Sequence, residues 1–143
     1  MSPPEAQLVV RPFEPGEEDA VVALWQRCGL VVPWNDPRRD IARKRQVNPE
    51  LFLVGTLEGR VVAVVMVGYD GHRGWINYLG VDPEVQRHGF GRRIMDVVEA
   101  KLRERGCPKI NLQVRSANAG VIAFYERLGF QVEDRVSMGK RLG

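Results

Sequence analysis

The spacing of apolar positions in the first fifty residues predicts one short strand followed by two helices. Residues 7–10 carry three β-compatible apolar side chains, whereas residues 20–28 repeat apolar side chains at helical spacing. Acidic residues 17–19 precede this second segment and Gly29 follows it, as expected at the two ends of a helix. Asp36 before Pro37 then predicts the N-terminal cap of a basic helix that runs to about Gln46.

The middle of the chain predicts an antiparallel meander of three strands. Residues 51–57 and 60–69 are β-rich and are joined by a Glu-Gly turn, and the glycine-rich turn 70–74 leads into a third strand over residues 75–81. Gly80 interrupts this third strand. A glycine inside a strand marks either a bulge, a close approach of a ligand to the backbone, or merely a weak position in the strand.

The second half of the chain predicts a strand, helix, strand order. Residues 89–105 form the most regular apolar stripe, and residues 109–114 alternate as a strand. A single helix between two strands implies a parallel pair with a right-handed crossover. A short helix ending at Gly129 follows, and residues 130–141 are expected to form one or two closing strands. Together the patterns predict one mixed α/β domain over residues 1–143, with antiparallel N-terminal strands, a parallel central pair and about four helices.

Composition limits the class of protein. The 143 residues, 44% of them hydrophobic, suffice for one ordinary core, and the net charge of +3 is a mild preference for anionic ligands that falls short of a nucleic-acid footprint. Cys28 and Cys107 lack the spacing of a disulfide framework or a zinc site, which favours a reducing compartment. The segment MSPPEAQLVV has no basic region of a signal peptide, and the longest apolar run, residues 61–67, is too short to cross a bilayer. A soluble cytoplasmic protein is expected.

The candidate chemistry lies at the junction between the strand at residues 75–81 and the helix that begins near Gly89. The first N–H groups of a helix lack internal partners and carry the positive end of the macrodipole, so they suit phosphate oxygens. Gly89 and Gly91 would let a phosphate approach the backbone, and arginines 87, 92 and 93 add positive charge. Spacing alone leaves a flexible loop before a helix as an equal alternative. A dinucleotide fingerprint would need glycine at Ile94, and the Gly-Lys-Ser/Thr run of a phosphate-loop NTPase is absent.

Two motifs in this order resemble the GNAT superfamily of acetyltransferases. Gln86-Arg87-His88-Gly89-Phe90-Gly91 after Val81-Asp82-Pro83 is similar to the family's coenzyme A motif, and the segment Asn118–Phe130 is similar to its second signature. With the predicted element order the resemblance covers nearly the whole chain. Segments 33–37 and 68–74 resemble the YpeA-like subgroup, near the ribosomal-protein N-acetyltransferases.

The resemblance implies a GNAT acyl-CoA N-acyltransferase fold and an acetyl-CoA-dependent enzyme that acetylates a primary amine by direct attack. Tyr125 would protonate the departing thiolate as general acid, although a core tyrosine would show the same helical spacing. Asn118 would contact the pantetheine, and it also fits a helix N-cap. The remaining cofactor contacts implied by the family are Leu79, Gly80, Val81, Gln86, Arg87, His88, Gly89, Phe90, Gly91 and Arg92.

The chain departs from the family at the general base. Trp75 and Gln113 stand where many relatives carry a glutamate, and neither can take a proton. Deprotonating a lysine-type amine at pH 7 costs roughly 4 to 5 kcal/mol, but an α-amino group costs only about 1 to 1.5. This favours an acceptor of low pKa, or deprotonation through water with help from Asp70 or His72, for which simple turn chemistry is the alternative.

The acceptor side is less specific. Trp34 and Asn35 could shape acceptor specificity, or Trp34 could be a core or dimer contact. Two rival functions stay open: a catalytically weak or inactive acyl-CoA-binding or regulatory module, and a basic interaction domain that uses residues 38–45. No metal is needed, neither nucleic acid nor membrane is expected as a partner, and the acceptor and the oligomeric state, including a homodimer, are not defined by the sequence.

Overall fold

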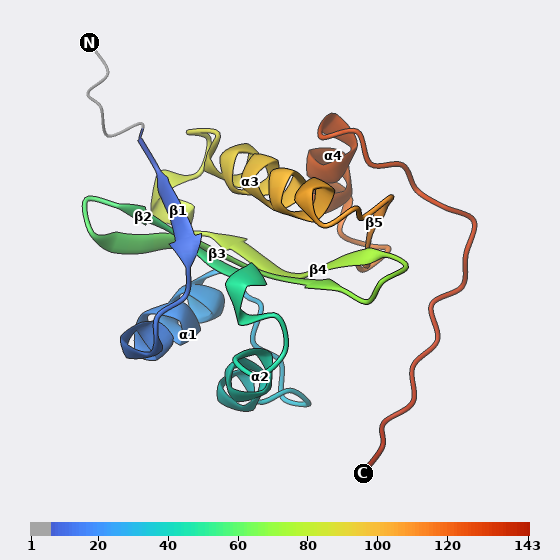
Figure 1. Ribbon diagram of the computed structural model, residues 1–143, viewed down its shortest axis with the longest axis horizontal. Helices are drawn as coiled ribbons and strands as arrows, with labels where there is room; N and C mark the ends of the chain where they lie inside the picture. The colour runs from blue at the N-terminus through green and yellow to red at the C-terminus, as the bar shows by residue number, and fades with distance from the viewer. Residues whose placement is uncertain (1–6) are drawn as a thin grey trace. The chain divides into compact units, whose positions relative to one another are not determined.

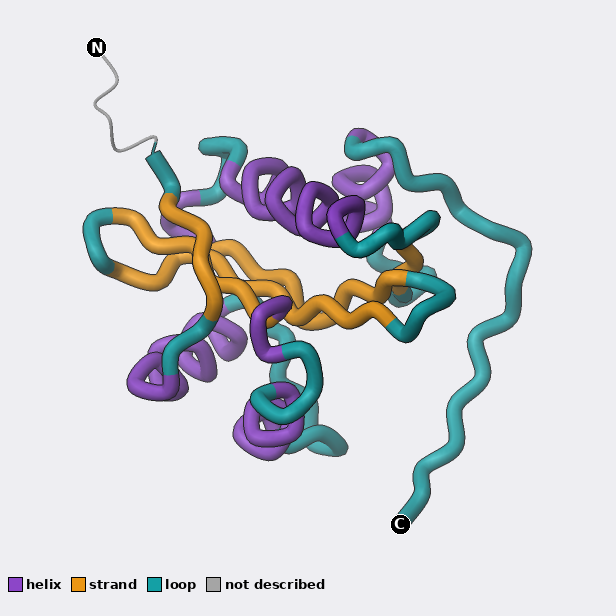
Figure 2. The backbone as a smooth tube through the Cα atoms, in the orientation of Figure 1, coloured by secondary structure: helices purple, strands orange, loops and turns teal. Residues whose placement is uncertain are grey.

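The computed structural model describes residues 7–143 as two compact units, one ending at Asn111 and the other covering Leu112–Gly143. The prediction about the N-terminal segment MSPPEAQLVV falls mainly on residues 1–6, which lie outside the described part. Figures 1 and 2 show the course of the chain. The helices and strands are β1 (Val9–Pro12), α1 (Glu18–Arg27), α2 (Pro37–Lys44), β2 (Phe52–Leu57), β3 (Arg60–Tyr69), β4 (Gly74–Val81), α3 (Phe90–Glu104), β5 (Ile110–Leu112) and α4 (Ala119–Arg127).

One mixed sheet has the strand order β1-β2-β3-β4-β5. The first four strands pair antiparallel in sequence order, with Val10 opposite Gly55, Val54 opposite Val64 and Val67 opposite Ile76. This confirms the predicted meander. Helix α3 connects β4 to its neighbour β5, which is the strand, helix, strand crossover of a parallel pair. The mixed α/β class with about four helices is therefore confirmed.

Helices cover both faces of the antiparallel strands. Figure 1 shows α1 and α2 on one face and α3 on the other. Trp25 and Ile41 pack with Phe52 and Val64 on the first face, and Phe90 packs with other buried residues on the second. Strand β3 is buried on both faces over most of its length, as its valine-rich run predicts for a central strand.

The helix ends of this unit follow local capping chemistry. The Asp36 carboxylate accepts the N–H groups of Arg38 and Arg39 at 3.0 and 3.3 Å, so the predicted N-cap of α2 is confirmed. Helix α2 ends at Lys44, two residues before the expected Gln46. The chain turns there toward Asn48, which is left-handed (φ 50°) and precedes a proline, and neither feature continues a helix.

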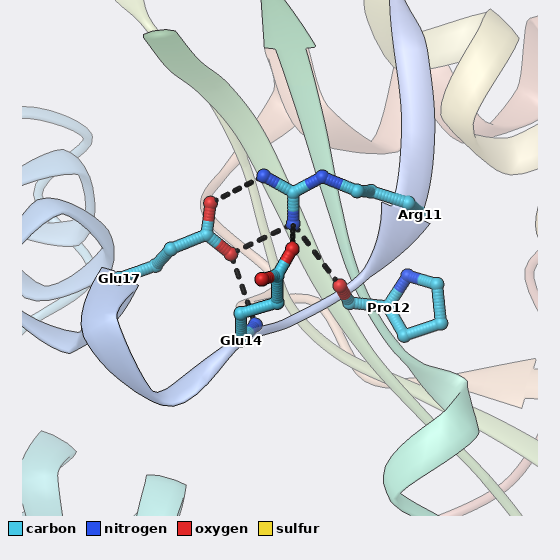
Figure 3. A network of polar contacts seen from close by, with 4 residues as sticks. All are labelled: Arg11, Pro12, Glu14 and Glu17. Carbon is cyan, nitrogen blue, oxygen red and sulfur yellow. Dashed lines mark hydrogen bonds and ion pairs between the residues drawn. The ribbon is translucent and has the colours of Figure 1, made fainter. Parts of the chain in front are cut away.

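An ion pair fixes the path from β1 into α1 (Figure 3). The Arg11 guanidinium donates two hydrogen bonds to the Glu17 carboxylate, at 2.9 and 2.6 Å. The same carboxylate accepts the backbone N–H of Glu14 at 2.9 Å. The hydrogen bond from Arg11 is the largest cause that lowers the pKa of Glu17, and burial only partly offsets it.

The second unit contains α4 and a long irregular segment. Asn118 caps α4 by accepting the N–H of Val121 at 3.2 Å, and Gly129 ends it in a left-handed conformation (φ 96°). The expected closing strands over residues 130–141 are wrong, because this segment is drawn as loop throughout (Figure 2) and has no strand. Its apolar residues after Phe130 stay exposed, and a local hydrogen bond from the N–H of Arg135 to the carbonyl of Glu133 turns the chain where a strand would have to continue.

Other outcomes concern the ends of elements and the chain as a whole. Strand β5 is shorter than the expected 109–114, and α4 matches the predicted short helix. Cys28 and Cys107 are both free thiols. Within residues 7–143, no helix combines the length and the apolar character that crossing a membrane would require. One domain over residues 1–143 stays a prediction.

Candidate functional site

Asp82 anchors the loop that follows β4. This carboxylate is buried, accepts the N–H of Glu84 at 3.0 Å, and pairs with Arg27 of α1 at 2.8 Å. Burial alone would raise the pKa of Asp82, but the hydrogen bonds from Glu84 and Arg27 together lower it. Asp82 before Pro83 is a capping signal of the same kind as Asp36 before Pro37, so this anchor was readable in the sequence.

The loop itself combines an internal brace with two left-handed residues. The side-chain amide of Gln86 donates to the carbonyl of Val81 at 3.2 Å and closes the loop on the end of β4. Arg87 (φ 73°) and Gly89 (φ 77°) then reverse the chain into α3. Gln86 to Gly89 are all exposed, so this segment stays accessible to a ligand.

The N-terminus of α3 offers an anion site. Gly89 is the N-cap and no side chain of the described residues caps the helix, while the first backbone bond of the helix runs from Arg93 to Gly89 at 3.0 Å. The N–H groups of Phe90, Gly91 and Arg92 therefore have no partner within the helix. A Cβ placed on Gly89 would meet nothing within 4 Å, so the space over this backbone is open. The geometry fits a phosphate group.

The side chains around this helix end have different roles. Phe90 is buried in the core and His88 stacks on it at 5.6 Å, so Phe90 can contribute only its backbone to a ligand. Arg93 donates to the carbonyl of Leu8 at 3.3 Å. Arg87 and Arg92 are exposed at the loop and the first turn.

Strand β4 contains a bulge next to this loop. Val64 is opposite Gly80 and Met66 is opposite Asn77, so Tyr78 and Leu79 together face a single residue of β3. Tyr78 has φ 55°, a conformation that is costly for a bulky side chain. Trp25 holds it in place: the indole stacks on the Tyr78 ring at 4.1 Å and donates to the Tyr78 carbonyl at 3.1 Å.

Position 80 has little room for a side chain, because the residues that follow α1 lie against it. A Cβ at this position would lie 3.1 Å from Sγ of Cys28 and 3.3 Å from Cδ1 of Leu30. The sequence left a bulge, a ligand approach and a weak position open. The structure shows a bulge just before Gly80, and the atoms that lie close to Gly80 belong to Cys28 and Leu30.

An open pocket of about 540 Å³ lies beside the bulge. Polar groups of α2 and β4 line it, and two of them are joined directly. The Tyr78 hydroxyl donates to Oδ2 of Asp40 at 2.7 Å. Arg43 donates to the other oxygen of Asp40 at 2.8 Å, and Lys44 donates to the carbonyl of Val67. The lining residues are Asn35, Asp40, Arg43, Lys44, Val47, Met66, Asn77 and Tyr78.

Of the residues expected on the acceptor side, the structure brings only Asn35 into this pocket. Trp34 is 55% exposed and does not line it. The polar members Asp40, Arg43 and Tyr78 were missed, because their place depends on how α2 packs against β4 and no local pattern encodes that contact.

Asp70 and His72 lie in the turn before β4, at the opposite end of this strand from Val81 (Figure 1). Eight residues of strand separate the two ends by roughly 20 Å. Asp70 accepts the backbone N–H groups of Arg73 and His72, each at 2.8 Å, and these bonds lower its pKa. The lowered pKa makes this carboxylate a weaker base, and its contacts are those of a turn.

The second unit holds the predicted general acid and the predicted pantetheine contact. Tyr125 is buried against Phe124 and Phe130, with ring centroids at 5.1 and 5.4 Å. Burial raises the pKa of Tyr125 to about 12, so its hydroxyl keeps its proton at neutral pH. Asn118 is the cap of α4, and Gln113 donates to Ser137 at 2.6 Å.

Three arginines of the basic run of α2 form ion pairs within the protein. Arg38 pairs with Glu18 and Asp19 at 2.7 Å each, Arg43 pairs with Asp40, and Arg39 lies 3.7 Å from its own N-cap carboxylate. These pairs offset part of the positive charge of the helix, and Arg43 keeps further N–H donors beside its bond to Asp40.

Relatives with known sequences match nearly the whole chain. One match is an acetyltransferase of Yersinia enterocolitica, 47% identical over 133 residues, which are 93% of this chain and 94% of that protein. An acetyltransferase of Sodalis glossinidius is 48% identical over 134 residues, with the same coverage. The sequence also matches the acetyltransferase (GNAT) family over residues 18–130.

Solved structures share the fold. The ribosomal-protein-S18-alanine N-acetyltransferase of Escherichia coli superposes with a TM-score of 0.74 at 27% identity, covering 87% of this chain and 78% of that one. Ard1 of Thermoplasma volcanium gives 0.76 at 25% identity, with 88% and 84% covered. The paia N-acetyltransferase of Thermoplasma acidophilum, solved in complex with coenzyme A, gives 0.77 at 17% identity with 91% and 93% covered, which shows the fold alone. This chain belongs to the GNAT family and is an acetyltransferase.

Proposed function

We propose that this acetyltransferase moves the acetyl group of acetyl-CoA to a primary amine, either a protein N-terminus or a small-molecule amine. One observation carries the donor half of this proposal. Helix α3 begins after Gly89, with no side-chain hydrogen bond capping it among the described residues and with open space at the Cβ position of Gly89. This is the arrangement that a pyrophosphate requires.

Different residues around this helix end are proposed to contact different parts of acetyl-CoA. The backbone from Gly89 to Arg92 would bind the pyrophosphate oxygens, with the guanidinium groups of Arg87 and Arg92 nearby and Gln86 bracing the loop. The backbone of Leu79 to Val81 would accompany the pantetheine arm and polarise the thioester carbonyl. The family resemblance also implies cofactor contacts for Asn118 and Tyr125, and these are proposed on that resemblance alone.

The proposed reaction is a direct transfer. The lone pair of the neutral amine attacks the thioester carbonyl carbon, the new C–N bond forms, and the sulfur leaves with the electron pair of the C–S bond. The amine loses one proton to the solvent, and the Tyr125 hydroxyl supplies one proton to the thiolate. Burial keeps the proton on this hydroxyl at neutral pH, and the tyrosinate formed in the step takes a proton back from the solvent.

The acceptor amine must reach the neutral form without a strong base. Trp75 and Gln113 replace the expected glutamates, and β4 contains no acidic residue. An amine of low pKa is therefore the easier substrate. The E. coli structural relative is named as an alanine N-acetyltransferase, which supports an α-amino group as the acceptor. The free thiols Cys28 and Cys107 support a cytoplasmic location.

The rival function is an acyl-CoA-binding module that never turns over. Release of free coenzyme A thiol from acetyl-CoA, measured with a panel of peptides and small amines, separates the two. We expect amine-dependent release, and Tyr125→Phe should lower kcat while leaving the affinity for acetyl-CoA within about twofold, since only a proton donor is removed. Tyr69→Phe, which alters an exposed hydroxyl 3.5 Å from a carbonyl, is the control. Binding of acetyl-CoA without release by any amine would support the rival.

A further inference from the structure

The pocket between α2 and β4 contains more positive than negative charge. Arg43 and Lys44 contribute two cationic groups, and Asp40 contributes one carboxylate, which leaves a single net positive charge. Amide side chains of Asn35 and Asn77 add hydrogen-bonding groups to the same lining. A pocket built only for a neutral or cationic amine would not need two cations.

The two cations are held in place by bonds within the protein. Asp40 accepts from Arg43 at 2.8 Å through one oxygen and from Tyr78 at 2.7 Å through the other, so this carboxylate orients the guanidinium while tied to β4. Lys44 is half-buried along its stem and donates to the carbonyl of Val67. An ammonium has three N–H donors and a guanidinium has five, so each group can also bind a ligand anion.

The pocket adjoins the strand proposed to carry the thioester. Tyr78 lines the pocket and directly precedes Leu79, the first residue of the backbone proposed to follow the pantetheine arm. An acceptor in the pocket would therefore present its amine close to the acetyl group. All these residues belong to the first unit.

On the basis of the function proposed above, we propose that this pocket binds the acceptor, and that the acceptor is a small amine which also carries a carboxylate, as a free amino acid does, held by Arg43 and Lys44. The attacking form of such a molecule has a neutral amine and one negative charge, which matches the net charge of the pocket. Within the lining the positive charge exceeds the negative charge by one, which favours the neutral amine over the ammonium form, while Glu50 acts on Lys44 and Asp36 acts on Tyr78 from outside the lining. A phosphate would bring up to two negative charges and match less well.

The proposal is tested by comparing acceptors with and without the carboxylate. Because the carboxylate also makes the amine of an amino acid more basic than that of its carboxamide, each KM is expressed as the concentration of neutral amine. Coenzyme A release would be measured with leucine, methionine, serine and glutamate, with the α-carboxamide of each, and with hexapeptides that begin with the same residues. We expect each amino acid to have a KM at least about tenfold below that of its carboxamide, the effect of losing about one charge-assisted hydrogen bond.

Variants of the lining residues test whether this preference arises in the pocket. Arg43→Gln and Lys44→Met should each raise the KM for the amino acids by about tenfold and leave the KM for the carboxamides unchanged within twofold. Arg43→Lys should restore part of the preference. Arg39→Gln is the matched control, because Arg39 lies on the same helix with its side chain 78% exposed and does not line the pocket. Lys44→Met keeps the aliphatic part of the side chain, and the Arg43 side chain is exposed. At least one of these variants is therefore expected to fold like the wild type.

The outcomes separate the two proposals. Turnover that is equal for amino acids and carboxamides, faster for the hexapeptides, or equally sensitive to Arg39→Gln would overturn the acceptor assignment while leaving the acetyltransfer intact. Bound acetyl-CoA with no release by any amine would instead overturn the proposed function, and the acceptor assignment with it.

Discussion

The hydroxyl of Tyr78 in β4 donates a 2.7 Å hydrogen bond to the carboxylate of Asp40 in α2. Tyr78 also stacks on Trp25 of α1, so one side chain connects both helices of this face to the bulge of the sheet. Burial is the largest of the causes that raise the pKa of Tyr78, and the hydrogen bond to Asp40 adds to it. The hydroxyl therefore keeps its proton at neutral pH and can donate to Asp40.

Tyr78→Phe should lower the free energy of unfolding by about 1 to 2 kcal/mol, the usual cost of removing a hydrogen bond to a partly buried charge. The ring, and with it the contact with Trp25, is retained. Urea unfolding at pH 7 measures the change, with Tyr69→Phe as the control, since its hydroxyl makes only a 3.5 Å contact. Equal losses in the two variants would show that the bond to Asp40 contributes nothing.

Gly80→Ala should destabilise the protein by about 1 to 3 kcal/mol, because the new methyl would lie 3.1 Å from the Cys28 sulfur. Removing that sulfur should relieve the clash, so Gly80→Ala combined with Cys28→Ala should lose less than the two single changes added together. Thermal unfolding of the four proteins measures this coupling. Gly68→Ala, where a methyl meets nothing within 4 Å, is the control. Additive losses of stability would show that Gly80→Ala does not destabilise the protein through contact with the Cys28 sulfur.

The ion pair between Arg11 and Glu17 should make stability depend on pH in the acid range. The folded pKa of Glu17 lies below its ordinary value of 4.5, so its contribution is complete above that value and is lost as the pH falls through the folded pKa. After allowing for solvent screening, Glu17→Gln should cost about 1 kcal/mol at pH 7 and clearly less at pH 3.

Urea unfolding of wild type and Glu17→Gln at both pH values checks this. Glu14→Gln removes a more exposed carboxylate 3.3 Å from the same guanidinium and should cost less than about 0.5 kcal/mol at pH 7. A loss for Glu17→Gln that is as large at pH 3 as at pH 7 would contradict the assignment.

Asp70→Asn and His72→Ala should leave the pH profile of kcat/KM unchanged. Both residues lie in the turn at the far end of β4 from Val81, and asparagine can accept the same backbone N–H groups. The measurement is the amine-dependent release of coenzyme A between pH 6 and 9. A general base stops working when it is protonated, so a shift of the acidic limb in either variant would return that residue to the list of candidate bases.

The elements and the donor loop were predictable because their signals are local. Asp36 before Pro37, glycine after a helix and the valine-rich run of β3 each act within a few residues of sequence, and the structure follows them. The loop from Gln86 to Gly91 was readable for the same reason, since a strand, a turn and a helix start are all local features.

The failures involve contacts between distant segments. Residues 130–141 have apolar positions suited to a strand, but a strand also needs a partner edge, which the local sequence does not specify. The pocket was missed because Asp40 and Tyr78 are 38 residues apart and meet only when α2 packs on the bulge of β4. Gly80 was recognised as unusual, but its neighbour Cys28 could not be inferred from the chain alone.

The central claim is that the N-terminus of α3 binds acetyl-CoA, and calorimetric titration of Gly89→Leu against Gly106→Leu tests it most directly. Both glycines have φ 77° and open space around them, and they flank the two ends of the same helix, so both leucines impose the same backbone strain of about 1 to 2 kcal/mol. Only the leucine at 89 would stand at the N-terminus of α3, where the pyrophosphate is proposed to bind. We predict heat of binding for wild type and Gly106→Leu, and an affinity at least about tenfold weaker for Gly89→Leu. Equal affinities in the two variants, or no heat with the wild-type protein, would contradict the claim.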